Sequence, residues 1–290
     1  MSDCALCPRR CHVDRNSQHG YCRASGKISV NLHQPHYGEE PVISGTRGSG
    51  TIFFAHCNMR CVFCQNHSIS VGGHGEEMNP DKLAQLMCEL QERGTHNVNL
   101  VTPTHYTPQL REAIMIAKKA GLRIPVVWNS NAYENPETLK TLEGLVDIYL
   151  PDFKYSDPKM SLRYSDASGY PRWAKSAIME MFRQVGHLNV NYEGLAVRGL
   201  LIRLLILPGD INGIKNILDW ILTELGDQTH ISLMGQYYPT HRSCDFSEIN
   251  RPLTEQEYDF ALLHLEKLGF ENGFIQEVGS SADQTPAFRK

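Results

Sequence analysis

Nine cysteines are the residues of this 290-residue chain with the greatest capacity for chemistry. Seven of them form two groups near the N-terminus, while Cys88 and Cys244 stand apart. The count is odd and the first residues contain no apolar export segment, so we expect the thiols to stay reduced. Reduced cysteines at short spacing indicate metal binding or catalysis and do not fit a disulfide scaffold.

The tighter group is Cys57, Cys61 and Cys64, with three and then two residues between successive cysteines. Three thiolates on one short loop can ligate three irons of a [4Fe–4S] cubane and leave the fourth iron open to another ligand. A zinc site or a redox dithiol is the alternative. The third cysteine, and the position of the loop directly after an apolar run, favour the cluster.

The second group is Cys4, Cys7, Cys11 and Cys22. Four thiolates satisfy a tetrahedral zinc ion or all four irons of a second cubane. Neither leaves an open coordination position, so we expect a structural or electron-relay role. Spacing alone does not separate zinc from iron–sulfur, and a group that binds no metal is the remaining alternative.

These groups need a scaffold, and the rest of the sequence predicts one. Short apolar runs alternate with amphipathic stretches from residue 51 onward, which is typical of a parallel sheet covered by helices. We predict an α/β fold, a partial (β/α)6 TIM-like barrel in residues 51–290. Residues 1–50 would form a cysteine-rich extension with little regular structure. The predicted strands are 51–55, 98–102, 124–128, 146–150, 200–206 and 230–234, with a short seventh starting at residue 273.

Three of the intervening helices have clear signals. Asn79-Pro80 is a typical start for a helix that ends before Gly94, and Thr254 to Glu257 matches a capping box. Residues 214–225 carry an apolar stripe at helical spacing.

Polar residues follow the predicted strands, at the ends where barrels of this kind place their functional groups. The notable ones are Thr102, Thr104, His105, Asn129, Ser130, Asn131, Asp152 and Lys154. Each also has an ordinary structural interpretation, as a turn residue, a hydrogen-bonded histidine or an ion pair. Arg203 lies inside an apolar strand, where a buried guanidinium needs a carboxylate partner. Asp152 could be that partner.

The cysteine loop, with Phe63 before its last cysteine, resembles that of the radical S-adenosylmethionine superfamily. Within it, the chain is similar to the pyruvate formate-lyase activating enzyme group, and more closely to its uncharacterised iron–sulfur branch. The stretches that carry the resemblance extend over almost the whole chain: LCPRRC, CNMRCVFCQN, NLVTPTHY, LPDFKY, RLLILPG and GQYYP.

The resemblance implies a [4Fe–4S] cluster on Cys57, Cys61 and Cys64 whose open iron binds the amino and carboxylate groups of S-adenosylmethionine. Reductive cleavage of this cofactor would release a 5′-deoxyadenosyl radical, which abstracts a hydrogen atom. By the same resemblance, the cofactor-binding residues would be Phe63, Thr102, Thr104, His105, Asn129, Asn131, Asp152, Lys154 and Arg203.

One departure from the activases leaves the substrate open. Activases carry a glycine-glycine-glutamate segment after the second strand, and this chain has Thr102-Pro103-Thr104-His105 there. One hypothesis is an activase that acts on a glycyl radical enzyme. A second is an enzyme that modifies a small molecule or peptide. The third, a non-catalytic zinc-binding interaction protein, is disfavoured by the polar strand ends.

Charge and hydropathy limit the partners. The chain has 28 basic and 32 acidic residues, a net charge of −4, which argues against a general nucleic-acid binder. No run of 18 apolar residues occurs, so we expect no membrane span. We expect a cytoplasmic oxidoreductase that receives electrons from a donor such as flavodoxin or ferredoxin.

Overall fold

A mostly parallel β-sheet organises the chain in the computed structural model, which describes residues 3–276 and 286–288. Successive neighbours in its central part are all parallel, and each predicted strand is present. In spatial order these strands are β2 (Ser49–Phe54), β4 (Val98–Val101), β5 (Val126–Ser130), β6 (Ile148–Pro151), β8 (Ala196–Leu205), β9 (His230–Met234) and β10 (Gly273–Gln276).

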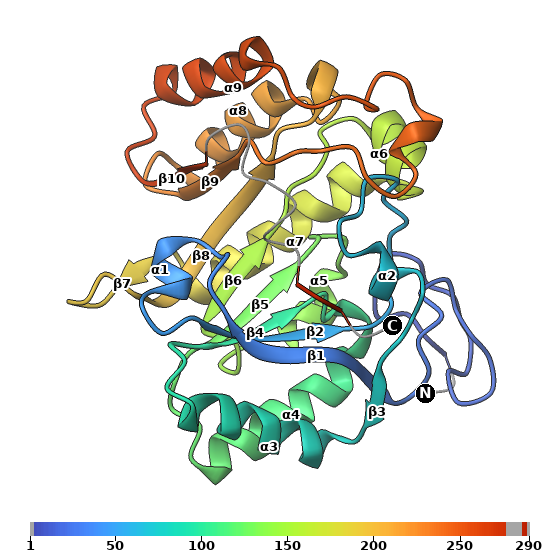
Figure 1. The fold of residues 1–290 in the computed structure, drawn as a ribbon. Coiled ribbons are helices and arrows are strands. Elements are labelled where there is room, and N and C mark those ends of the chain that lie inside the picture. Colours follow the sequence, from blue (N-terminus) through green and yellow to red (C-terminus); the bar gives the residue numbers. More distant parts are fainter. Residues whose placement is uncertain (1–2, 277–285, 289–290) are drawn as a thin grey trace.

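The sheet stays open and does not close into a complete barrel (Figure 1). At one edge lies β10, and beyond β2 lie two antiparallel strands, β1 (Ile28–His36) and then β3 (Glu76–Met78). Within the described ranges no ladder joins β3 to β10. The short β7 (Asn189–Val190) pairs only with β8. The predicted fold class, a partial barrel of parallel strands, is confirmed.

The expectation of little regular structure in residues 1–50 is wrong for β1. This strand pairs with β2 from Val30 opposite Phe54 to His36 opposite Ser49. Its polar and proline-containing sequence has no strong strand signal, but pairing covers the free edge of β2 and supplies the hydrogen bonds. The boundary predicted after residue 50 therefore falls inside β2. A short helix, α1 (Pro41–Ser44), joins the two strands.

Helices follow most of the parallel strands. Figure 1 shows α3 and α4 together beside β2 and β4, and α8 and α9 together beside β9 and β10. The helices are α2 (His67–Ser70), α3 (Pro80–Glu92), α4 (Thr107–Ala120), α5 (Pro136–Lys140), α6 (Pro158–Ser165), α7 (Tyr170–Val185), α8 (Ile214–Leu225) and α9 (Glu255–Lys267).

The predicted helix starts are confirmed. The Asn79 side chain accepts a hydrogen bond from Lys82 N at 2.9 Å, and Pro80 occupies the first turn. The capping box of α9 is complete, because Thr254 and Glu257 each bond to the backbone of the other.

The two faces of the sheet have different roles. Successive strand residues point to opposite faces. Ile52 and Phe54 pack into the main core. Phe53, between them, forms a separate cluster with Ile69 and Val101. This second face holds the pocket described below.

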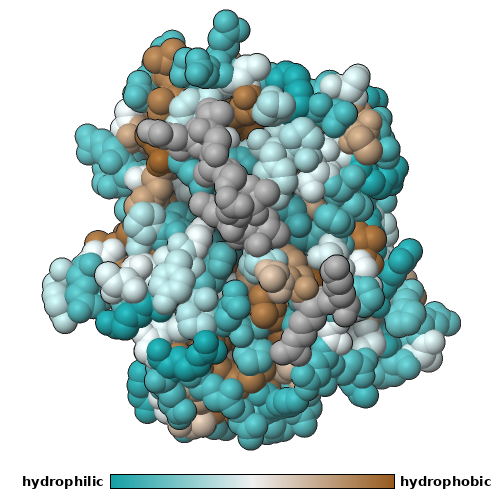
Figure 2. All heavy atoms as spheres, in the orientation of Figure 1, coloured by the Kyte–Doolittle hydropathy of each residue, from teal (hydrophilic) through white to brown (hydrophobic). Residues whose placement is uncertain are grey.

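The surface is mixed in character. Figure 2 shows one face that is largely hydrophilic, with scattered hydrophobic patches. None of the helices in the described residues is both long and apolar enough to span a bilayer.

Gly199 offers a test of how closely β8 approaches its neighbours. Its φ is +126°, and an added Cβ would lie 2.4 Å from both His187 O and Leu188 Cα. Gly121 also has a positive φ, +110°, but an added Cβ would meet nothing within 4 Å. We expect Gly199→Ala to lower the free energy of unfolding by roughly 1–3 kcal/mol more than Gly121→Ala, because overpacking adds to backbone strain. Chemical denaturation measures the difference, and equal losses would contradict this packing.

Candidate active site

One pocket at the carboxyl ends of the strands gathers most of the predicted site. Its wall contains residues from β1, β2, β4, β5, β6, β8 and β9 or from the segments that follow these strands. The predicted residues on its wall are Cys57, Cys61, Phe63, Cys64, Thr102, Asn129, Asn131, Asp152, Lys154 and Arg203.

The three cysteines lie on the loop after β2, and each sulfur has a polar neighbour from another element. Such hydrogen bonds orient thiolate ligands and tune a cluster that they hold. The contacts are Asn131 Nδ2 to Cys57 Sγ at 3.4 Å, Ser165 Oγ to Cys61 Sγ at 3.1 Å, and Cys64 Sγ to Ser70 Oγ at 3.4 Å.

Burial strongly affects these thiols. It raises the pKa of Cys57 to about 12 and that of Cys64 to about 11, and the neighbouring Cys61 contributes to both shifts. Metal-free thiols would therefore be neutral near pH 7. Metal ligands must be deprotonated, so binding of iron here would release protons and be favoured by higher pH.

The cysteine loop is anchored by Arg60. This side chain donates from Nη1 to Cys57 O at 2.7 Å and to Met59 O at 2.9 Å. Its Nη2 donates to Tyr21 O at 2.6 Å, which ties the loop to the N-terminal segment. Its backbone N–H donates to Ser165 O at 3.0 Å, at the end of α6. The loop is thus held from two sides.

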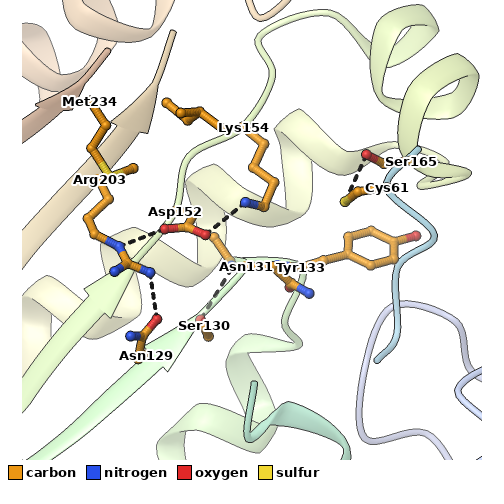
Figure 3. A network of polar contacts seen from close by, with 12 residues as sticks. Cys61, Asn129, Ser130, Asn131, Tyr133, Asp152, Lys154, Ser165, Arg203 and Met234 are labelled. Carbon is orange, nitrogen blue, oxygen red and sulfur yellow. Dashed lines mark hydrogen bonds and ion pairs between the residues drawn. The ribbon is translucent and has the colours of Figure 1, made fainter. Parts of the chain in front are cut away.

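Arg203 is the centre of a buried charge network beside the cysteines (Figure 3). Its Nε donates to Asp152 Oδ1 at 2.8 Å, its Nη1 to Glu39 Oε2 at 3.0 Å, and its Nη2 to Asn129 Oδ1 at 2.7 Å. Lys154 Nζ donates to the other Asp152 oxygen at 2.7 Å. The predicted carboxylate partner of Arg203 is confirmed, and a second one, Glu39, is added.

The network controls the charge of its two acids. Burial by itself raises the pKa of Asp152, but Arg203 and Lys154 outweigh it and lower the pKa below its usual value. Asp152 therefore stabilises the fold above its unfolded pKa, and this contribution is lost as the pH falls through the lowered folded pKa. For Glu39, burial prevails over Arg203 and raises the pKa.

Glu39 was not predicted from the sequence. It follows β1, 164 positions before Arg203, and its Oε1 also accepts from Asn99 Nδ2 at 2.9 Å. The acidic pair Glu39-Glu40 before Pro41 was the only available signal, and it matches no motif. The contact between Glu39 and Arg203 joins residues far apart in the chain, so it becomes visible only in the tertiary structure.

Three positions after strands have left-handed backbone. They are His56 at φ 72°, Thr102 at φ 60° and Ala132 at φ 57°. For the β-branched Thr102 this is a costly conformation that glycine adopts freely. Strain of this kind concentrates at functional sites. The N–H of Thr102 donates to Asn129 O at 2.9 Å, which helps to hold this conformation.

Thr104 and His105 do not line this pocket. Thr104 Oγ1 donates to the buried Glu134 at 2.9 Å, and burial raises the pKa of that carboxyl. His105 lies behind the cysteine loop, with Nε2 2.9 Å from Ala55 O. Burial lowers the pKa of His105 to about 3, so the ring is neutral. Both side chains brace the scaffold, although the sequence placed them among the cofactor-binding residues.

The four N-terminal cysteines come together around a second, smaller cavity. Cys4, Cys7 and Cys22 are buried and Cys11 is partly buried. Among the described residues, neither this group nor the first places three metal-ligating side chains around a single ion position. A metal at Cys4, Cys7, Cys11 and Cys22, whether zinc or iron–sulfur, stays a prediction at this stage.

Residues 51–221 match the sequence profile described as the Radical SAM superfamily. This range contains the cysteine loop and five of the parallel strands. The chain belongs to this superfamily.

Individual proteins resemble this chain in sequence or in fold. The uncharacterized protein MJ0674 of Methanocaldococcus jannaschii is 32% identical over 279 residues, covering 93% of this chain and 76% of that protein. Methylornithine synthase (PylB) superposes with a TM-score of 0.52 at 15% identity, over 76% of this chain and 61% of its own. Streptococcus suis SuiB bound to S-adenosylmethionine has a TM-score of 0.51 at 11% identity, with coverages of 77% and 48%. At such identities the likeness shows the fold alone, and the chain spans less than two thirds of either solved structure.

Superfamily membership implies a [4Fe–4S] cluster and S-adenosylmethionine, and the pocket fits both. Cys57, Cys61 and Cys64 supply thiols on one loop, with a hydrogen-bonding neighbour at each sulfur. Positive and negative side chains of the Arg203 network lie on the same wall, where a zwitterionic ligand requires both.

The Arg203 network predicts a large stability effect. We expect Arg203→Met to lower the free energy of unfolding by about 3–5 kcal/mol, because it removes the cation that pairs with Glu39 and leaves Asp152 paired with Lys154 alone. Arg242→Met is the matched control. Its exposed pair with Asp245 is worth about 0–1 kcal/mol. Urea denaturation of both variants measures the difference, and a small loss for Arg203→Met would contradict the network.

Proposed function

We propose that this chain cleaves S-adenosylmethionine reductively at a [4Fe–4S] cluster on Cys57, Cys61 and Cys64. Cys57, Cys61 and Cys64 would hold the cluster, and the cluster would supply the electron for reductive cleavage of a sulfur–carbon bond of the cofactor. The expected products are methionine and 5′-deoxyadenosine, which would carry a hydrogen atom taken from the substrate. The observation that carries the proposal is the presence of the three thiols and the Arg203 network on one pocket wall.

The residues around the cysteines would hold the site rigid. Asn131 contacts Cys57, and Ser165 contacts Cys61 while sharing a 2.6 Å hydrogen bond with Tyr155 OH. Lys154 places a positive charge near Cys61, which favours the thiolate form. These contacts orient the ligands and stabilise negative charge on sulfur.

The Arg203 network would bind the methionine end of the cofactor. A carboxylate needs cations, which Arg203 and Lys154 provide, whereas an ammonium and a sulfonium need anions, which Asp152 and Glu39 provide. Asn129 adds an amide at the same place. Phe63, which is buried at the pocket wall, offers an aromatic surface for the adenine.

Apolar side chains complete the pocket and would protect a radical from water. Phe53, Val101, Leu205 and Met234 lie on the wall beyond the polar groups. Exclusion of water prevents side reactions of a reactive intermediate.

The proposed substrate is a backbone glycine of a glycyl radical enzyme, with a flavodoxin or ferredoxin as electron donor. Support comes from the resemblance of CNMRCVFCQN and LPDFKY to the activases. The altered segment Thr102–His105 keeps direct modification of a small molecule or peptide as the second candidate.

The cysteine assignment predicts a loss of cofactor cleavage. We expect Cys57→Ala, Cys61→Ala and Cys64→Ala each to abolish formation of 5′-deoxyadenosine after anaerobic reconstitution and reduction. Cys88→Ala is the control, since this half-buried cysteine lies on α3 outside both groups. If the three variants cleave the cofactor as fast as the Cys88→Ala variant, the cluster is elsewhere.

The substrate proposal predicts an electron paramagnetic resonance signal. A candidate glycyl radical enzyme, mixed with reduced protein and S-adenosylmethionine, should gain a glycyl radical, and the Cys57→Ala variant should give none. Deoxyadenosine formed in amounts equal to a modified peptide or small molecule, without a glycyl signal, would favour the second candidate.

A further inference from the structure

We propose that Cys4, Cys7, Cys11 and Cys22 hold a second [4Fe–4S] cluster that passes electrons to the first through Asn58. The destination of those electrons rests on the proposed function, while the presence of the cluster does not. Five features support the second cluster: the shared cavity, the close approach of the backbone to Cys11, a buried arginine, the local charge and the position of Asn58.

The four thiols lie around one cavity. Among the described residues, they do not converge on a single position where one metal ion could contact three of them. Leu6, Gly20 and His105 lie on the same wall as the cysteines. A zinc ion lies about 2.3 Å from each of its sulfur ligands, so four zinc ligands leave no space between them. A cubane places each thiolate on a different iron and fills such a space.

The chain approaches these cysteines closely. At Gly20 an added Cβ would lie 3.1 Å from both Cβ and Sγ of Cys11, so glycine permits the contact. The next backbone N–H, that of Tyr21, donates to Cys11 Sγ at 3.3 Å. A backbone N–H aimed at sulfur is the kind of contact that sets the potential of an iron–sulfur centre.

Arg15 is a buried cation that lacks an anion. Its side chain is on the cavity wall, and the residue is 2% exposed. It donates only to carbonyls, those of Ala24, Ser25 and His105, and over the described ranges no carboxylate forms an ion pair with it. A buried guanidinium without a partner is costly. Four thiolates around a cubane carry a net negative charge, which would supply the missing anion.

The surrounding segment is basic in an acidic protein. Residues 1–27 contain five lysines and arginines and two acidic residues, whereas the whole chain has a net charge of −4. A local positive field stabilises an anionic centre and steers an acidic electron carrier to this part of the surface.

Asn58 lies between the two groups of cysteines. It is fully buried, and its side chain hydrogen-bonds to Cys7. Its Oδ1 lies 3.9 Å from Cys57 Sγ. Arg9 Nε donates to Asn58 O at 2.9 Å and fixes the same residue to the N-terminal segment. The Asn58 side chain thus lies between Cys7 of one group and Cys57 of the other.

The electron balance is simple. A reduced flavodoxin or ferredoxin would give one electron to the second cluster. That electron would pass to the first cluster and be used there to cleave the sulfur–carbon bond. Zinc has no redox chemistry and would only tie the segment together.

Metal analysis tests the cluster without the first site. We expect the full-length Cys57→Ala/Cys61→Ala/Cys64→Ala variant, reconstituted anaerobically, to bind about four irons and four sulfides per chain. The electron paramagnetic resonance signal of the reduced variant should not change when S-adenosylmethionine is added, because a cluster with four cysteine ligands has no open iron. Adding Cys4→Ser and Cys22→Ser should remove the iron, with circular dichroism verifying the fold. One zinc per chain, or no metal, would overturn the proposal.

Electron donors test the relay. In the Cys4→Ser/Cys22→Ser variant we expect flavodoxin-driven formation of 5′-deoxyadenosine to fall roughly tenfold or more, while dithionite-driven formation stays within about twofold. The iron content of the first site is measured in parallel. Unchanged flavodoxin-driven activity, or an equal loss with both donors, would overturn the relay. Wild-type protein that cleaves nothing with dithionite would instead contradict the proposed function.

Discussion

The arrangement of the pocket depends on the hydrogen bonds and ion pairs of the largely buried Arg203 guanidinium. This guanidinium joins β8 to the end of β6 through Asp152, to β5 through Asn129 and to the segment after β1 through Glu39. Because an unpaired buried charge is costly, the three strand ends and the N-terminal segment must stay together for the charge to be satisfied. The same pairing leaves charged groups of both signs on the pocket wall.

The cost of an unpaired buried charge also explains the positions of two other cations, Lys154 and Arg15. Lys154 lies close enough to Cys61 to favour its thiolate, and Arg15 does the same for Cys22. In each case a positive side chain accompanies thiols that are too deeply buried to ionise easily. One of these cations therefore accompanies the thiols of the strand-end pocket, and the other accompanies the thiols of the N-terminal segment.

Amide side chains connect these two regions. Asn131, from the loop after β5, donates to Asn58 Oδ1 at 2.8 Å and also contacts Cys57. Asn58 in turn donates to Tyr133 O at 2.7 Å. Hydrogen bonds thus join the cysteine loop, the loop after β5 and the N-terminal segment into one unit.

The sequence by itself determined the two groups of cysteines, the parallel strands and the helix caps, because spacing, apolar runs and capping residues are local signals. It also placed Asp152 and Lys154 at the end of one strand and Arg203 inside another, and these three side chains meet in the structure. Only the tertiary structure decided that β1 joins the sheet, that Glu39 reaches Arg203, and that Thr104 and His105 turn away from the pocket. Those outcomes depend on partners far apart in the chain, and burial and pairing of charge with such partners leave no local pattern.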